Sequence, residues 1–133
     1  MKKAFHDKFQ MECTFMDEGI AFCNSKKNVY FPYGCMDSLN LSLLGVLQAV
    51  SHAQVCCFTV QKQDKGEIKE LVKQAKAAMK TAPAADAVVI EMDKIHVDSS
   101  LPHEEQLRQY KAHFVQGMIA KEQYDFMKRM LTD

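Results

Sequence analysis

The sequence predicts an α+β fold in which a small antiparallel β-barrel or sandwich, capped by one helix, precedes a C-terminal helical hairpin. Two observations lead to this prediction. Strand-like segments separated by turn residues recur about every ten residues from position 10 to 60. After that, apolar residues recur every third or fourth position, which is typical of amphipathic helices.

Composition limits the kind of protein this is. The chain has 133 residues, 47% hydrophobic and 26% charged, which favours one domain, or a small domain with an appendage, over a disordered chain. Seventeen basic residues balance seventeen acidic ones, so we expect no nucleic-acid partner.

Two further features bear on location. The longest nearly apolar run, residues 43–50, is too short for a membrane helix, which needs about 20 residues. Asp7 and Lys8 interrupt the N-terminal segment where a signal peptide would be apolar. We therefore expect a cytoplasmic protein.

Alternating residues and turn signals define the predicted strands. The alternation is clearest at Leu39, Leu41 and Leu43, which are separated by polar residues. Gly45 breaks this pattern, and a second turn is expected at residues 52–53. The predicted strands cover residues 11–15, 19–23, 29–32, 36–43, 46–50 and 54–60.

A helix that ends before Pro83 is predicted next along the chain. Asp64 is expected to cap its N-terminus, with Glu67 as the capping-box partner. We expect this helix to cover the open side of the strands. Its apolar stripe consists of Ile68, Leu71, Val72, Ala75 and Met79.

The chain divides into three parts. Residues 1–83 are the β domain with its capping helix, residues 84–100 an acidic linker, and residues 101–133 the helical hairpin. Within the linker, residues 88–92 fit either a short extra strand or irregular structure. The hairpin is below the roughly 40 residues that fold without a staple or partner. It must therefore dock on the β domain or on another chain.

Two short motifs mark the hairpin: residues 117–119 are Gly-Met-Ile, and residues 128–131 are Lys-Arg-Met-Leu. They resemble the Gly-x-Ile turn and the Lys-x-x-Leu-Leu end of the short C-terminal domain family called SHOCT. Ala120 departs from the family, which usually has a hydroxyl N-cap at this position, and a lost cap costs about 1 kcal/mol. The resemblance implies a role in oligomerisation.

The part before the linker has Asp-Glu-Gly-Ile at 17–20, Phe-Pro-Tyr at 31–33 and an alternating strand at 36–43. By these features, residues 9–80 resemble the bacterial pleckstrin-homology-like domains. The two modules commonly occur together in this order, and the resemblance implies a PH-like β fold and a non-catalytic scaffold. Phosphoinositide-binding members hold phosphates around the first loops, which here offer only Lys26 and Lys27, so we do not expect headgroup recognition there.

The first functional interpretation is an interaction module that forms a homo-oligomer through its hairpin, with no membrane contact. An aromatic cluster could also line a groove for a peptide added at a strand edge. The candidate hairpin residues are Leu107, Tyr110, Phe114, Ile119, Tyr124, Met127 and Leu131, and the cluster consists of Tyr30, Phe31 and Tyr33.

The alternative interpretation is a peripheral module that binds anionic lipid or another acidic partner. Five lysines share the helix face opposite the apolar stripe. The acidic segment 84–106 could neutralise them within the chain or between subunits, which would weaken this interpretation. These lysines are Lys65, Lys69, Lys73, Lys76 and Lys80.

Motifs for catalysis or metal binding are absent from the sequence. None of the five cysteines has C-x-x-C spacing, and Cys56 and Cys57 point to opposite faces of a strand. The chain has neither a Gly-x-Ser-x-Gly motif nor a glycine-rich phosphate loop. We therefore expect no enzyme activity, cofactor or metal.

Overall fold

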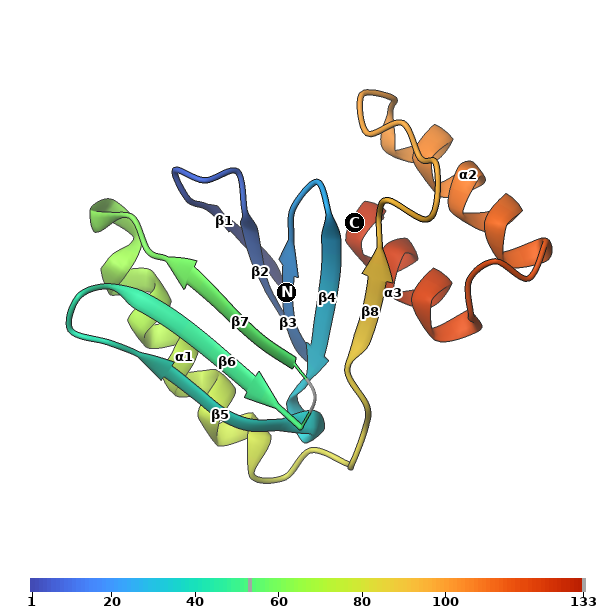
Figure 1. The fold of residues 1–133 in the computed structure, drawn as a ribbon. Coiled ribbons are helices and arrows are strands. Elements are labelled where there is room, and N and C mark those ends of the chain that lie inside the picture. Colours follow the sequence, from blue (N-terminus) through green and yellow to red (C-terminus); the bar gives the residue numbers. More distant parts are fainter. Residues whose placement is uncertain (53, 133) are drawn as a thin grey trace.

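The computed structural model describes residues 1–52 and 54–132, which form two antiparallel sheets and three α-helices (Figure 1). Among these residues, no strand of one sheet pairs with a strand of the other, so the sheets do not close into a barrel. The five-stranded sheet has the order β1-β2-β3-β4-β8, with β1 Lys2–His6, β2 Glu12–Met16, β3 Gly19–Cys23, β4 Lys27–Pro32 and β8 Val88–Glu91. The three-stranded sheet has the order β5-β6-β7, with β5 Met36–Leu41, β6 Val46–Ser51 and β7 Gln54–Thr59.

The inner faces of both sheets enclose the first core together with helix α1, Lys65–Met79. Helix α1 contributes Ile68, Val72 and Ala75 from one face, as the apolar spacing predicts. Aromatic rings pack edge to face in this core, with centroids 6.1 Å apart for Phe5 and Phe15 and 5.8 Å apart for Phe22 and Phe31. The three-stranded sheet adds Leu39, Leu47, Ala49 and Phe58.

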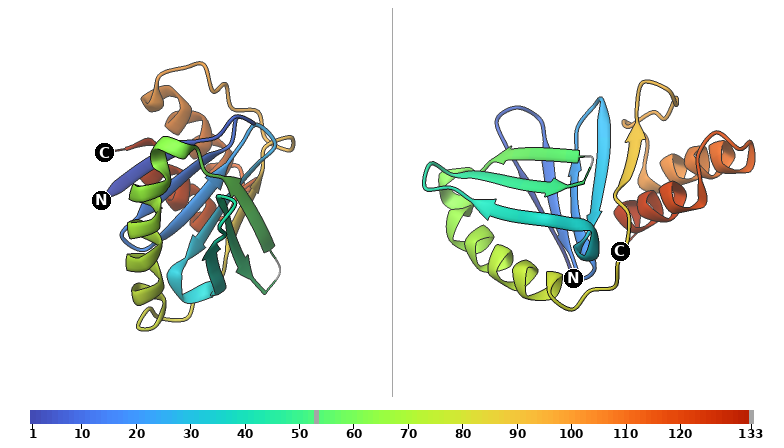
Figure 2. Two further views of the ribbon diagram at one scale, coloured as in Figure 1. Left: turned by 90° about the vertical axis from the view of Figure 1, so that its left-hand side faces the viewer. Right: turned by 60° about the horizontal axis from the view of Figure 1, so that its bottom comes forward.

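A second core lies on the opposite face of the five-stranded sheet, where helices α2 (His103–Val115) and α3 (Lys121–Leu131) dock (Figures 1 and 2). Side chains alternate along a strand, so β4 sends Val29 and Phe31 to the first core and Tyr30 to the second. Covering both faces explains why the four consecutive residues 28–31 of β4 are all buried. The second core consists of Met16, Ala21, Tyr30, Ile90, Ile95, Tyr110, Ile119, Phe126 and Met127.

The turn between α2 and α3 has the geometry that Gly117 permits. Its φ is +77°, its N–H donates to the Phe114 carbonyl at 3.0 Å, and the next N–H donates to the His113 carbonyl at 2.9 Å, which is a Schellman end. Ala120 has no side-chain oxygen that could cap α3, and the side chain of Gln123 compensates for this. Its Oε1 accepts the Ala120 N–H at 2.6 Å, and its Nε2 donates to the Val89 carbonyl at 2.8 Å. One glutamine thus caps α3 and fastens it to β8.

The structure differs from three local expectations. Strand β1 was not predicted, because only Phe5 of its five residues is buried and the alternation is therefore weak. The strand expected over 36–43 ends at Leu41, and Leu43 projects into solvent. The capping box at Asp64 does not form, because this residue ends a 3₁₀ turn in helical geometry and its side chain caps nothing.

Two other expectations concern the loops. The extra strand considered for 88–92 is present as β8, which pairs antiparallel with β4. The turn expected at residues 52–53 includes Ala53, which lies outside the described residues.

We predict that Phe126→Ala lowers the free energy of unfolding by about 3–5 kcal/mol. The ring is fully buried and stacks on Tyr30, with centroids 5.2 Å apart, so truncation leaves a cavity in the second core. Urea denaturation measures the change, with Val115→Ala as the matched control because Val115 is 75% exposed. A loss below about 1 kcal/mol would mean that the hairpin is not part of the cooperative fold.

Candidate functional site

The exposed face of α1 borders a groove of about 460 Å³ that we call the lysine groove. Leu41 and the buried Val72 give it an apolar side, and Glu70 is the acidic residue among those that line it. Four of the five predicted lysines line the groove, and Lys80, which follows the last turn of α1, does not. The four are Lys65, Lys69, Lys73 and Lys76, and their spacing of three or four residues places them along one side of the helix.

The turn between β5 and β6 carries two exposed leucines that we call the leucine tip. Leu43 is 96% exposed and Leu44 is 93% exposed. Ser42 and Gly45 hold the turn: the Gly45 N–H donates to the Ser42 carbonyl at 3.1 Å, and the Ser42 Oγ accepts the Val46 N–H at 3.1 Å. The positive φ of Gly45, +86°, directs the chain into β6, so both leucines occupy the outer corners of a tight turn.

Two lysines connect the groove to the strand that leads into the tip. Lys65 Nζ donates to the Leu43 carbonyl at 3.2 Å, and Lys76 Nζ donates to Asn40 Oδ1 at 3.4 Å. These bonds hold positive charge beside the two exposed leucines. The site therefore combines an apolar projection with a cationic face.

The acidic segment does not neutralise these lysines. Within residues 1–52 and 54–132, none of the ion pairs includes a lysine between 65 and 80. Acids of the segment pair elsewhere, Glu91 with Lys27 at 3.8 Å and Glu105 with Arg108 on its own helix. The cationic face is thus available to an external anion.

The predicted hairpin residues are used mainly inside the chain. Tyr110, Ile119 and Met127 are buried in the second core, and the others are half-buried. Phe114 and Tyr124 stack with centroids 5.3 Å apart, which joins the two helices. The half-buried residues are Leu107, Phe114, Tyr124 and Leu131.

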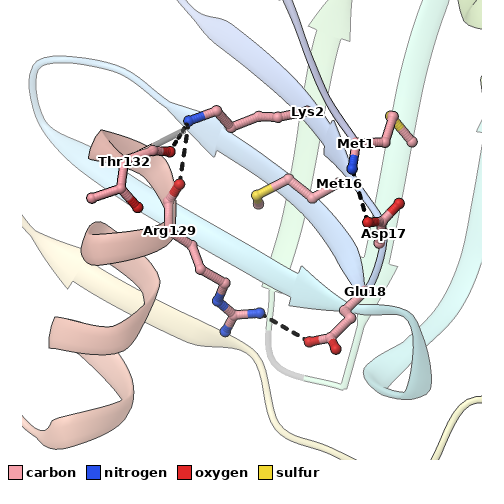
Figure 3. Close-up of a pocket in the computed structure, with 7 residues that line it drawn as sticks. All are labelled: Met1, Lys2, Met16, Asp17, Glu18, Arg129 and Thr132. Carbon is pink, nitrogen blue, oxygen red and sulfur yellow. Dashed lines mark hydrogen bonds and ion pairs between the residues drawn. The ribbon is translucent and has the colours of Figure 1, made fainter.

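Polar contacts fasten the end of α3 to the sheet (Figure 3). Lys2 Nζ donates to the carbonyls of Arg129, Met130 and Thr132 at 3.3, 3.1 and 2.6 Å, where the negative end of the helix dipole favours a cation. The Arg129 guanidinium donates to Glu18 at 3.1 Å and to the Tyr30 hydroxyl at 3.2 Å, and lies over that ring. Residues far apart in sequence thus hold the hairpin in place.

The three residues of the aromatic cluster are buried and are divided between the two cores. Phe31 and Tyr33 belong to the first core and Tyr30 to the second. Tyr33 donates its hydroxyl to the Met16 carbonyl at 2.7 Å. Tyr30 and Tyr33 also line one hollow of about 450 Å³, which Phe31 does not reach.

Burial also keeps most of the thiols protonated. It raises the pKa of Cys23 from 9.0 to about 12 and those of Cys35 and Cys56 to about 11, and it raises the pKa of Cys13 well above 9.0. A protonated thiol is neither a nucleophile nor a metal ligand. In the described part of the chain, no three His, Cys, Asp or Glu side chains gather in a group that could hold a metal ion.

Comparison of the chain with models of protein families, with curated proteins and with solved structures found no match in any of the three. Among residues 1–52 and 54–132, no helix combines the length and the apolar character needed to cross a membrane.

The leucine tip was missed at the sequence level because Leu43 continued an alternating pattern. The available signal was Ser-Leu-Leu-Gly at 42–45, in which a turn-favouring serine and glycine flank two large apolar residues. Two leucines between turn residues cannot both face a core, so the motif itself indicates exposure.

We predict that stability falls as pH rises from about 9 to about 12. Burial raises the pKa of Cys23 from 9.0, and those of Tyr33 and Tyr110 from 10.0, to about 12 in each case. The unfolded chain therefore loses these protons first, and the stability present below the unfolded-state pKa is lost towards the folded-state pKa. The midpoint of urea denaturation should be lower at about pH 10.5 than at about pH 8, and less so in Cys23→Ser. An unchanged midpoint would contradict this.

Proposed function

We propose that this chain is a non-catalytic binding module that attaches to anionic membrane surfaces through the lysine groove and the leucine tip. The observation that carries the proposal is the pair of leucines, 96% and 93% exposed, beside four lysines without an ion-pair partner in the described residues. Peripheral proteins bind membranes by inserting apolar side chains at the headgroup boundary while basic residues meet anionic lipid.

The two parts of the site have complementary energetic roles. A basic residue near an anionic leaflet contributes about 1 kcal/mol, and full burial of a leucine contributes about 1.5–3 kcal/mol. Ordering and desolvation reduce the total. Four lysines and two leucines therefore suffice for reversible attachment, and salt should weaken the lysine share by screening.

This proposal reverses the order of the two sequence-based interpretations. The hairpin was expected to dock on the β domain or on another chain, and its apolar stripe packs on its own sheet, where Tyr110, Ile119 and Met127 are buried. In the described residues, the two most exposed large apolar side chains, Leu43 and Leu44, lie at the β5–β6 turn next to the lysines.

The family resemblances belong to the same proposal. Four antiparallel strands, three more and one helix, in this order, support a pleckstrin-homology-like interpretation of the first part. The glycine turn at Gly117, with Ile119 buried after it, supports the SHOCT-like interpretation of the hairpin. The proposed site is on α1 and the β5–β6 turn, and not on the first loops, whose lysines are Lys8, Lys26 and Lys27.

We predict that the full chain co-sediments with phosphatidylserine-containing vesicles at low salt and not with pure phosphatidylcholine vesicles. The double variant Lys69→Gln, Lys73→Gln should bind at least about tenfold more weakly, because two contributions of about 1 kcal/mol are lost. Leu43→Ser with Leu44→Ser should weaken binding by a similar factor or more, because insertion is lost.

The matched controls are Lys111→Gln and Val115→Ser, which alter an exposed lysine and an exposed apolar residue of the hairpin. Circular dichroism confirms that each variant is folded. Absence of binding to anionic vesicles, or equal losses in the control variants, would overturn the proposal.

Self-association through the hairpin stays a prediction. The docked hairpin leaves two large apolar side chains exposed at the α2–α3 turn. These are Val115, 75% exposed, and Met118, 52% exposed. Light scattering of a Val115→Lys, Met118→Lys double variant tests it: a lower mass than the unaltered chain would support a hairpin interface, and an equal mass would exclude these residues.

A further inference from the structure

Of the four edge strands in the part of the chain that the structure describes, three are protected against pairing with another chain. Strand β1 carries Lys2, Lys3 and His6, and charged residues on an edge discourage pairing. Helix α3 covers β8, and Gln123 Nε2 donates a hydrogen bond to the Val89 carbonyl. Strand β5 has a register shift between Met36 and Ser38, and α1 packs beside it.

Strand β7, the fourth edge, has none of these protections. It has six residues, Gln54–Thr59, all in unbroken register with β6, and it contains no proline, glycine or charged residue. No Asp, Glu, Lys or Arg occurs between Asp37 and Lys62 in a chain that is 26% charged. Within the described residues, β6 is the only strand that pairs with β7.

The backbone groups at this edge can be assigned from the alternation of antiparallel pairing. The Val60 N–H donates to the Gly45 carbonyl at 2.7 Å, so Val60 directs its backbone groups toward β6. Every second residue before it does the same, which leaves the groups of Val55, Cys57 and Thr59 directed to the free edge. The side chains of these three residues are exposed as well.

The outer face of the three-stranded sheet is uncovered beside this edge. Figure 2 shows α1 and the five-stranded sheet on one side of β5, β6 and β7, with the other side open. Cross-strand pairing places only uncharged residues on that face: Ser38, Asn40, Val46, Gln48, Val50, Val55, Cys57 and Thr59. A chain added at β7 would extend an uncharged surface.

We infer that β7 pairs with β7 of a second copy of this chain, in antiparallel orientation about a twofold axis at Cys57. In this register Cys57 lies opposite Cys57 of the partner subunit, and Val55 lies opposite Thr59 of the partner subunit. All three outward backbone positions then form hydrogen-bonded pairs, and the two sheets become one of six strands.

A second copy fits this edge for two reasons. The chain itself supplies an unprotected strand of matching length. A twofold axis also brings each residue close to its own copy, so a charge near the axis would meet a like charge, and this strand has none. The proposal does not depend on membrane binding, and its interface is separate from the hairpin contact that Val115→Lys with Met118→Lys tests.

Sedimentation velocity without lipid, over a series of protein concentrations, tests the proposal. We expect a monomer–dimer equilibrium for the full chain. Cys57→Lys places two lysines opposite each other and should raise the dissociation constant at least tenfold, whereas Cys57→Ser should leave it within about twofold. Thr59→Lys is the second edge variant, in case Cys57→Lys does not fold.

Two controls separate the edge from other surfaces. Gln48→Lys puts the same charge on the same face but on the central strand, and Val115→Lys with Met118→Lys changes the hairpin; both should keep the dimer. A short bis-maleimide should cross-link the dimer through Cys57, and Cys57→Ser should abolish the cross-link. A chain that stays monomeric at all concentrations overturns the inference and would leave the edge to an extended peptide of another protein. A loss of dimer in Gln48→Lys as large as in Cys57→Lys also overturns it.

Discussion

The structure depends on one constraint: the five-stranded sheet is covered on both faces. Strands β3 and β4 send successive side chains to opposite cores, so Ile20 and Phe22 pack under the three-stranded sheet while Ala21 and Tyr30 pack under the hairpin. Neither core is complete without these two strands. The hairpin is therefore a layer of the fold, and its docking leaves α1 and the three-stranded sheet as the surfaces open to other molecules.

Much of the architecture follows from local patterns in the sequence. The strands at 46–50 and 54–60 could be predicted because they are short apolar segments next to turn residues. Helix α1 could be predicted because its apolar residues form a clear stripe. Strand β1 could not, because a charged edge strand needs only one buried anchor, Phe5. The way the sheets pack is also a property of long-range contacts, so periodicity alone left barrel and sandwich open.

The residues of the candidate site also divide into those that could be predicted from spacing and those that could not. The lysine face of α1 is a matter of helical spacing and could be predicted, including which residues share it. The fate of the hairpin residues could not, because the same apolar stripe fits a partner chain and its own sheet equally well. Exposure of Leu43 depends on where β5 ends, and element ends are set by turn geometry at Ser42 and Gly45 more than by alternation.

The hydrogen bonds between Lys2 and the last turn of α3 have a consequence for folding during synthesis. The Lys2 ammonium group donates to carbonyls that lie 127 to 130 positions later in the chain. During synthesis the first strands leave the ribosome long before these carbonyls exist, so the outer face of the five-stranded sheet stays uncovered until α3 has been made. The first core can form before that point and the second core cannot, so a chain interrupted before α3 would expose Tyr30 and its apolar neighbours.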